Sequence, residues 1–156
     1  MSIEKVRAYL DRFALGNRIS EFSVSSATVE LAAAALGTEG ARIAKSISLH
    51  SGDGGCVIVV CAGDCKIDNR KFKDRFAFKP KMLTPDEALS FTGHAVGGVC
   101  PFGLPDGIRV YLDESLKRHP MVFPAAGTPS SAVGFLPEEL AKATDGQWVN
   151  VTKDPE

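Results

Sequence analysis

Apolar residues recur every three or four positions near the beginning of the chain, with charged residues between them. This pattern predicts an amphipathic helix over residues 3–15, which the pair Gly16-Asn17 would end. Thr84, Pro85 and Glu87 have the arrangement of a capping box, which marks the beginning of another helix. Helices are predicted over residues 3–15, 29–36, 68–75, 84–93 and from 137 onward.

Apolar runs bounded by turn residues predict the strands. The clearest pair is residues 41–49 and 56–62, which a glycine-rich turn at 51–55 would join as a hairpin. Further strands are predicted over residues 19–24, 108–112, 121–125, 131–135 and 147–151. These strands are too closely spaced for regular βαβ winding, and no repeat or linker interrupts them. The pattern therefore predicts a single α/β domain of the α+β type over residues 1–156, with a frayed tail after Thr152.

The composition fits one globular domain and excludes some classes of protein. Of the 156 residues 44% are hydrophobic and 24% charged, and a chain of this length buries about 68–70% of its unfolded surface. Lys plus Arg (18) and Asp plus Glu (19) nearly balance, which excludes a histone-like protein but allows a local basic patch. No apolar run approaches the ~18 residues of a membrane helix, and the first residues lack a signal-peptide core. We therefore expect a soluble cytoplasmic protein without a membrane partner.

The cysteines predict reduced thiols rather than a metal centre. Cys56, Cys61, Cys65 and Cys100 form no CxxC pair and have no histidine at zinc-ligand spacing. We therefore expect no structural metal.

The most unusual segment is residues 93–107, which hold five of the 15 glycines. A loop of this length within a small domain is often functional, and glycine lets backbone N–H groups approach a ligand closely. Such donors suit an oxyanion or a phosphate. The segment matches neither the Walker A nor the GxGxxG pattern, which disfavours a nucleoside triphosphate. The alternative is a purely structural loop.

Lys45 is the second candidate. Strand alternation places it on the apolar side with Ile47 and Leu49, whereas Ser46 and Ser48 take the other side. A buried ammonium is costly without a partner. Lys45 therefore either lines a polar cavity or extends its ammonium to solvent from the end of the strand.

Residues 66–81 form a basic segment, with seven Lys or Arg residues against two Asp. Phe72, Phe76 and Phe78 alternate with these charges. The combination favours contact with a nucleic-acid backbone. The alternative is a solvated helix face whose aromatic residues belong to the core.

Weaker candidates surround the glycine-rich segment. The small polar turn at 125–131 would wall a pocket or merely connect two strands. His94 would contact a substrate or carry a proton, although a lone loop histidine is more often merely exposed. Cys100 would act as a nucleophile with His94 as its base, but no third residue that would orient them is evident.

Several of these stretches together resemble the YbaK and prolyl-tRNA synthetase-associated editing domain family. The stretches that carry the resemblance are residues 25–30, 43–47, 93–103, 110–114 and 122–127. The similarity spans roughly residues 20–150, and the lysine of strand 41–49 followed by a Gly97-x-x-x-Pro101 loop is its most specific part.

The resemblance implies a fold and an activity. The fold would be a compact α/β domain with a mixed, barrel-like β-sheet flanked by helices. The activity would be hydrolysis of mischarged aminoacyl-tRNA, mostly proline tRNA, by a free domain acting in trans. Water would attack the activated ester with help from the terminal ribose hydroxyl, so neither a protein nucleophile nor a cofactor or metal is implied. Partners would be mischarged tRNA and prolyl-tRNA synthetase, and we favour a monomer.

The resemblance and the pattern together assign candidate roles. The candidate catalytic residues are Lys45, Gly97, Gly98 and Pro101, with backbone N–H groups of the two glycines stabilising the oxyanion. The candidate substrate-binding residues are Ser26, Thr28, His94, Val99, Cys100, Phe102 and Gly127. The candidate tRNA-binding residues are Lys66, Arg70, Lys71 and Lys73.

The resemblance narrows the amino acid that is removed from the tRNA only to the class of small amino acids. The cysteine-editing branch carries an aspartate and other charged residues where residues 128–132 stand here, and the alanine-editing branch usually has a histidine in place of Pro124. We expect alanine, 2-aminobutyrate, serine or threonine, which differ by little more than a methylene or a hydroxyl. The alternatives are a non-catalytic tRNA or aminoacyl-nucleotide binding module on the same fold, or a hydrolase that uses Cys100 and His94.

Overall fold

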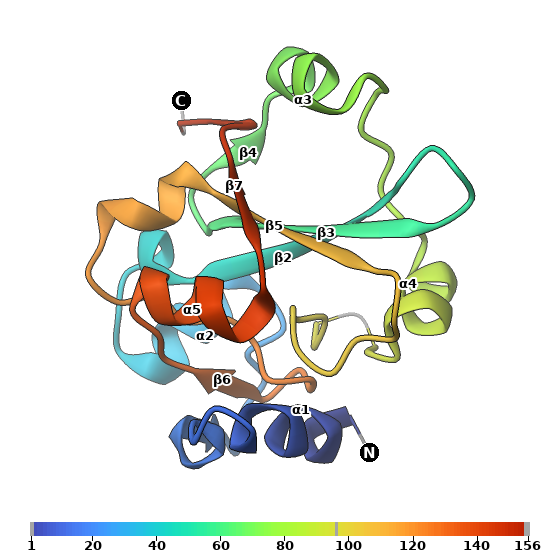
Figure 1. Ribbon diagram of the computed structural model, residues 1–156. Coiled ribbons are helices and arrows are strands. Elements are labelled where there is room, and N and C mark those ends of the chain that lie inside the picture. The colour runs from blue at the N-terminus through green and yellow to red at the C-terminus, as the bar shows by residue number, and fades with distance from the viewer. Residues whose placement is uncertain (1, 96, 155–156) are drawn as a thin grey trace.

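The computed structural model describes residues 2–95 and 97–154 (Figure 1). Its α-helices are α1 (Ser2–Asp11), α2 (Val29–Leu36), α3 (Asn69–Phe76), α4 (Pro85–Thr92) and α5 (Pro137–Thr144). Short 3₁₀ turns lie at η1 (Gly16–Arg18), η2 (Gly40–Arg42) and η3 (Glu114–Arg118). The strands are β1 (Ile19–Glu21), β2 (Ala44–His50), β3 (Cys56–Ala62), β4 (Lys66–Ile67), β5 (Arg109–Asp113), β6 (Ser131–Val133), β7 (Gln147–Val149) and β8 (Thr152–Lys153). Among the described residues, no helix is both long and apolar enough to cross a bilayer.

A mixed sheet in the order β2-β3-β5-β7 forms the centre of the fold. β2 and β3 are antiparallel, as the predicted hairpin requires, whereas β3–β5 and β5–β7 are parallel. The predicted mixed α/β fold is therefore confirmed, but its barrel-like character is not, because the sheet does not close. In the described part of the chain, β1 pairs with β6 and β4 pairs with β8, each as a separate two-stranded sheet. Neither pair connects the edge strands β2 and β7, which would be needed to close a barrel.

Local capping signals place the helices. Thr28 accepts a hydrogen bond from the Leu31 N–H at the beginning of α2, and Gly37 ends that helix with φ +68°. The capping box at Thr84 and Glu87 is complete, with N···O distances of 3.2 and 2.9 Å. Both helices are thus confirmed close to their predicted bounds.

The strands predicted over 19–24, 131–135 and 147–151 are present but end earlier, at Glu21, Val133 and Val149. Three larger differences from the predictions remain. Helix α1 ends at Asp11, earlier than predicted, because Ala14 turns left-handed at φ +59° and the Leu15 N–H bonds the Leu10 carbonyl. Residues 121–125 form no regular strand; two isolated bridges, at Val122 and Phe123, replace it.

The third difference is the tail, which is ordered through residue 154 because Thr152 and Lys153 pair with β4. Residues 155–156, also predicted to fray, lie outside the described part of the chain.

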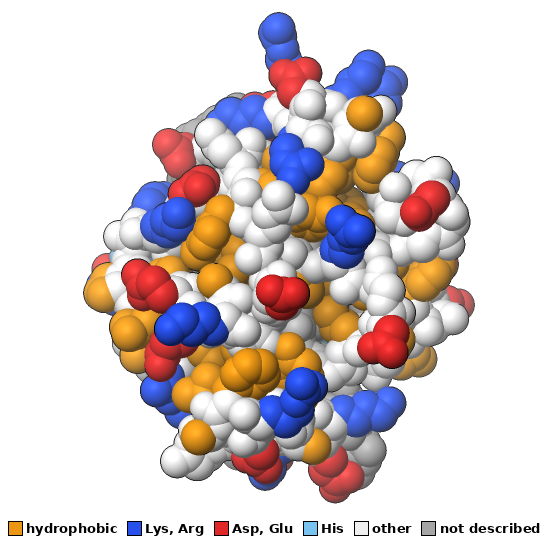
Figure 2. Space-filling model, viewed as in Figure 1, with side chains coloured by type: hydrophobic (Ala, Val, Ile, Leu, Met, Phe, Trp, Pro, Cys, Tyr) orange, Lys and Arg blue, Asp and Glu red, His pale blue; other side chains and the backbone are white. Residues whose placement is uncertain are grey.

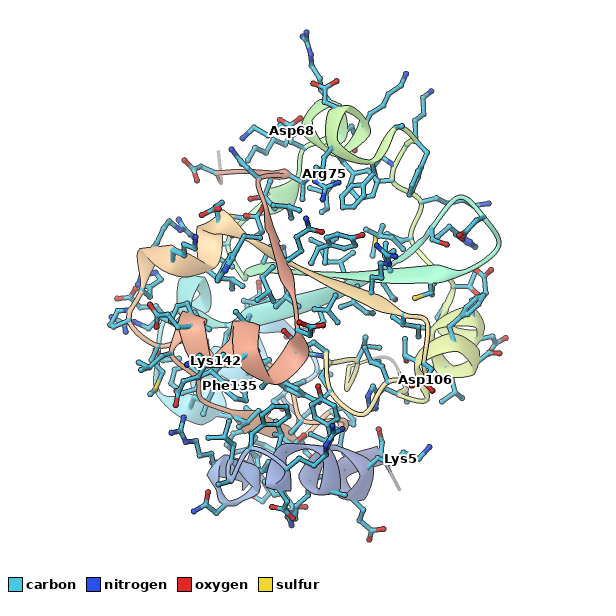
Figure 3. All side chains as sticks on the ribbon, viewed as in Figure 1. Lys5, Asp68, Arg75, Asp106, Phe135 and Lys142 are labelled. Atoms are coloured by element: carbon cyan, nitrogen blue, oxygen red, sulfur yellow. The ribbon has the colours of Figure 1, made fainter. Side chains whose placement is uncertain are left out.

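The sheet separates two hydrophobic clusters. Figure 1 shows α3 on one side of the sheet and α1 and α5 on the other. The larger cluster lies on the α1 and α5 side, where Phe135, labelled in Figure 3, is fully buried between them. The smaller cluster joins Leu49, Val59 and Phe72 of α3. Because both faces are covered, every residue of β3 is buried, as its uninterrupted apolar sequence indicates.

The buried carboxylate of Asp113 holds the last part of the chain. It lies at the end of β5 with 1% exposure, and it accepts hydrogen bonds from the Ser115 N–H, the Val151 N–H and the Thr152 hydroxyl at 2.9, 2.8 and 2.7 Å. Hydrogen bonds to a buried charged group are among the stronger ones in proteins. This carboxylate is the physical reason that the tail does not fray.

Asp113→Asn should lower the free energy of unfolding by about 1.5–3 kcal/mol, because an amide leaves at least one of these donors without an acceptor. Urea denaturation followed by circular dichroism measures the loss. Asp106→Asn, in the exposed loop labelled in Figure 3, is the control and should change stability by less than about 0.5 kcal/mol. Equal stability of the two variants would contradict the anchoring role.

Candidate active site

A cavity of about 390 Å³ opens where β2, the N-terminus of α2, the beginning of α4 and the glycine-rich loop meet. Its walls are mostly apolar, with a few hydroxyls and one ammonium. The residues that line it are Ser26, Ala27, Thr28, Val29, Ala32, Ile43, Ala44, Lys45, Ser46, Ile47, Ser48, Met82, Leu83, Pro85, Ala88, Gly97, Val99, Phe123, Ala125, Ser131 and Ala132. Such a concave, largely apolar site with few polar groups is typical of small-molecule binding.

The cavity exists because the outer edge of β2 is paired only at its ends. At one end Ala44 donates its N–H to the Phe123 carbonyl, and at the other Ser48 accepts from the Leu83 N–H. Backbone groups on one edge of a strand belong to alternate residues, so the N–H and C=O of Ser46 face outward between these two points. Neither group bonds a described residue outside the sheet. The floor of the cavity therefore contains the backbone N–H and C=O of Ser46, which bond no described residue outside the sheet.

Lys45 occupies the position that alternation predicts. Ile47 and Leu49, on the same side of β2, belong to the smaller hydrophobic cluster, and the Lys45 ammonium donates a hydrogen bond to the Cys65 carbonyl. Lys45 also lines the cavity, which is the arrangement that the cavity interpretation expects. The other side of β2 is not a solvated polar face, because Ala44 reaches the main core and the Ser46 hydroxyl is buried.

The glycine-rich loop is held against the turn that contains Gly127. A Cβ atom on Gly98 would lie 2.7 Å from the Gly127 carbonyl, which is closer than real Cβ contacts come. Gly97 has φ +90°, and a Cβ there would lie 2.9 Å from Ala27. Both positions therefore require glycine for close backbone approach. Val96, within the same predicted loop, lies outside the described residues.

The two glycines differ in the state of their backbone donors. The Gly98 N–H donates to the Ala95 carbonyl at 2.9 Å, whereas no hydrogen bond joins the Gly97 N–H to a described residue. Of the two glycines, Gly97 lines the cavity, whereas Gly98 does not and packs on Gly127.

Four buried residues of the glycine-rich loop do not line the cavity; they are His94, Cys100, Pro101 and Phe102. The His94 ring, predicted to be exposed or to contact substrate, is fully buried; its Nε2 bonds the Phe102 carbonyl at 2.7 Å and its Nδ1 contacts the Ser2 hydroxyl. Cys100 Sγ is 3.6 Å from His94 Nε2, but burial raises the pKa of this thiol to about 12. A buried, protonated thiol is a poor nucleophile, so the alternative of a cysteine hydrolase loses its support.

Another part of the wall is formed by residues 26–28 together with Ala125, Ser131 and Ala132, whereas Gly127, a predicted substrate-binding residue, does not line the cavity. Ser26 donates its N–H to the Pro129 carbonyl at 2.6 Å, which fixes the approach to α2. Ser131, the last residue of the predicted small polar turn, bonds within the turn to Ala126 and Thr128. By contrast, the buried hydroxyls of Ser26 and Ser46 have no hydrogen-bond partner in the described structure. Thr28 lines the cavity while capping α2.

The four predicted tRNA-binding residues lie away from this cavity, on β4 and α3. Lys71 donates its ammonium to the Thr152 carbonyl at 2.8 Å, so it has a structural partner, whereas Arg70 and Lys73 are exposed and flank a shallow hollow with Lys79. Lys66 is exposed as well. Figure 2 shows Lys and Arg side chains gathered at the top of the view, over α3.

The aromatic residues of the basic segment face the sheet. Phe72 is fully buried against Phe76 and Phe78, with ring centroids 4.5 and 5.6 Å away. Arg75, labelled in Figure 3 beneath α3, stacks over Phe76 and Tyr111 with its guanidinium carbon 5.1 and 5.7 Å from the centroids. The aromatic residues therefore serve the core, and only the charges remain as candidates for a nucleic acid.

No group of three or more His, Cys, Asp or Glu side chains in the described residues is arranged to hold a metal ion.

The geometry can be compared with known proteins. The model of the family described as "Aminoacyl-tRNA editing domain" matches residues 24–143. The chain belongs to this family. The match includes every residue of the cavity wall, while α1, β7 and β8 lie outside it.

Individual relatives agree with this assignment. The chain is 46% identical over 155 residues to "Uncharacterized protein YwhH" of Bacillus subtilis (strain 168), with 99% of each chain covered. It is 28% identical over 126 residues to "Putative Cys-tRNA(Pro)/Cys-tRNA(Cys) deacylase EbsC" of Enterococcus faecalis (strain ATCC 700802 / V583), covering 80% and 77% of the two chains. The solved structure "Crystal structure of a putative trans-editing enzyme for prolyl tRNA synthetase" superposes with a TM-score of 0.88 at 30% identity, covering 97% of each chain. These relations indicate a domain of the trans-editing deacylase type.

The buried imidazole of this editing domain predicts a pH dependence of its stability. Burial lowers the pKa of His94 below its ordinary value of 6.5, which it retains when unfolded. As pH falls through 6.5 the unfolded chain binds this proton first, so stability present above 6.5 is lost below it. Between pH 7.5 and 5.5 the wild type should lose up to about 1 kcal/mol more than His94→Gln, measured by urea unfolding. His119→Gln is the control and should behave as the wild type; an identical pH profile for His94→Gln would contradict the interpretation.

Proposed function

We propose that this protein is an aminoacyl-tRNA deacylase that acts in trans on tRNA mischarged with a small amino acid, proline tRNA being the favoured substrate. The observation that carries the proposal is the cavity itself, which joins Lys45, the open edge of β2 and the Gly97 N–H within the segment matched by the family. Prolyl-tRNA synthetase is the favoured partner, the cytoplasm the favoured compartment, and a monomer the favoured state.

The chemistry requires little of the protein beyond positioning. The aminoacyl ester is already activated, so water can add to its carbonyl; the bond to the ribose oxygen then breaks, releasing free amino acid and tRNA. The Gly97 N–H is the candidate donor to the oxyanion. The Ser46 carbonyl is a candidate acceptor for the α-ammonium, and a neighbouring ribose hydroxyl is suited to carry the proton to the leaving oxygen.

Lys45 supplies the fixed positive charge on the cavity wall. Its ammonium reaches the Cys65 carbonyl and leaves two further N–H donors for substrate. We assign it the role of holding the phosphate or ribose of the tRNA terminus, so that the ester is placed over the β2 edge.

Wild-type protein should deacylate proline tRNA charged with one or two of alanine, serine, threonine and cysteine in single-turnover reactions that contain EDTA. Lys45→Ala should lower the rate about tenfold or more, since a positioning charge is lost, while Lys45→Arg should restore part of it.

The control for the Lys45 experiment is the circular dichroism melting curve, which should be nearly unchanged in both variants. Deacylation at the wild-type rate by Lys45→Ala would remove Lys45 from the site. Binding of charged tRNA without loss of any ester would instead favour the binding-module alternative.

The exposed charges of α3 are the candidate path for the tRNA backbone. Lys73→Glu should weaken tRNA binding and reduce the slope of log K against log salt by about one, because one phosphate contact is lost. Filter binding at several salt concentrations measures both. Lys142→Glu on α5, on the other side of the sheet (Figure 3), is the matched control and should leave the slope unchanged. If the two variants give the same slope, the exposed charges of α3 form a solvated helix face and do not contact the tRNA.

A further inference from the structure

We infer that Ser2, at the beginning of α1, is a positioning residue of the candidate active site, and that its hydroxyl acts through His94 to hold the glycine-rich loop, and with it Gly97, in place at the cavity. The inference rests on the proposed function. It adds to the site a residue that lies outside the segment 24–143 matched by the family.

The His94 ring joins two parts of the glycine-rich loop. Its Nε2 bonds the Phe102 carbonyl at 2.7 Å, so the N–H of the neutral ring lies on Nε2 and Nδ1 is left as an acceptor. The Ser2 hydroxyl contacts this Nδ1 and is therefore its donor. Ser2 thus completes the hydrogen bonds of a fully buried ring that closes the stretch from residue 94 to residue 102 around Gly97.

Ser2 also lies against the turn on which the glycine-rich loop packs. A Cβ atom on Gly127 would lie 2.9 Å from the Ser2 carbonyl oxygen and 3.0 Å from Ser2 Oγ. A Cβ atom on Gly98 would in turn lie 2.7 Å from the Gly127 carbonyl. Ser2 therefore contacts two supports of the loop, the His94 ring and Gly127.

The rest of α1 keeps Ser2 in a fixed place. Val6 and Leu10 are fully buried in the larger hydrophobic cluster, where side chains are close-packed. Figure 3 shows Lys5 at the same end of α1 as Ser2, below the loop that carries Asp106. The first turn of this helix is therefore a firm support from which a single hydroxyl can hold the loop.

The position of the loop matters for the rate of the proposed reaction. A group that acts on the reacting ester must be accurately placed, and a displacement of about 1 Å can cost about 100-fold in rate. Ser2 is not part of the cavity wall, so its hydroxyl touches no bound substrate. Its loss should therefore slow the reaction of bound tRNA and leave the binding of tRNA unchanged.

The test measures deacylation with enzyme in excess by wild type and Ser2→Ala, each with its purification tag at the C-terminus. Ser2→Ala should lower the maximal rate about tenfold and leave the half-saturating enzyme concentration within about twofold of the wild-type value. Ser90→Ala, at an exposed position of α4, is the control and should keep the wild-type rate.

A double-mutant cycle tests whether Ser2 acts through His94. His94→Gln keeps an N–H group for the Phe102 carbonyl but has no acceptor in the place of Nδ1. In the His94→Gln background, Ser2→Ala should therefore change the maximal rate by less than about twofold, since the interaction is already lost.

A further measurement reads the position of the loop without using deacylation. The Gly98 N–H bonds the Ala95 carbonyl at 2.9 Å, and the Ala88 N–H in α4 bonds the Thr84 carbonyl at 2.8 Å. Hydrogen exchange followed by NMR should be at least about tenfold faster at Gly98 in Ser2→Ala than in the wild type, and unchanged at Ala88.

Three outcomes would overturn the inference: a wild-type rate in Ser2→Ala, rate losses of Ser2→Ala and His94→Gln that simply multiply, or exchange that accelerates equally at Gly98 and Ala88. If the wild type cleaves its ester and exchange at Gly98 is unchanged in Ser2→Ala, this inference fails and the deacylase proposal stands. If the wild type cleaves no ester but exchange accelerates at Gly98 alone, the deacylase proposal fails and the support of the loop by Ser2 stands.

Discussion

The partial pairing of β2 is the constraint on which the site depends. The strand bonds β3 along its length, but on its other edge Phe123 and the 81–83 segment are the only described parts of the chain that bond to it. An open strand edge ordinarily invites pairing with another chain. Here the open stretch is short and lies at the bottom of a cavity, between α2, α4 and the glycine-rich loop. The unpaired edge of β2 therefore presents backbone donors and acceptors to the cavity in fixed positions. Such groups need no reorganisation when a ligand binds.

Sequence reasoning succeeded where the signal is local. The caps of α2 and α4, the buried run of β3 and the side of β2 that carries Lys45 all follow from neighbours in the chain, and all are present in the structure. Sequence reasoning failed where contacts with segments distant in the sequence determine the local structure. The tail is ordered by Asp113, and residues 121–125 make two single bridges with elements far away in sequence. The family resemblance supplied what periodicity could not, namely that the glycine-rich loop and Lys45 belong to one site.

The glycine-rich loop contains residues that line the cavity, Gly97 and Val99, and buried residues that do not, such as His94. His94 drew attention as a possible proton carrier, but its ring nitrogens are engaged below the loop and burial lowers its pKa. Nothing in the sequence separates such a histidine from a catalytic one, because the difference lies in partners that the fold brings from α1 and from Phe102. Ser46 illustrates the converse: alternation assigns it only to the side of β2 opposite Lys45, and the structure shows that its hydroxyl is buried.

The contact between Gly98 and Gly127 has a consequence for how the protein can change over generations. Every amino acid that could replace Gly98 carries a Cβ, and that atom would meet the neighbouring backbone at 2.7 Å. The position is therefore closed to variation unless both turns move together.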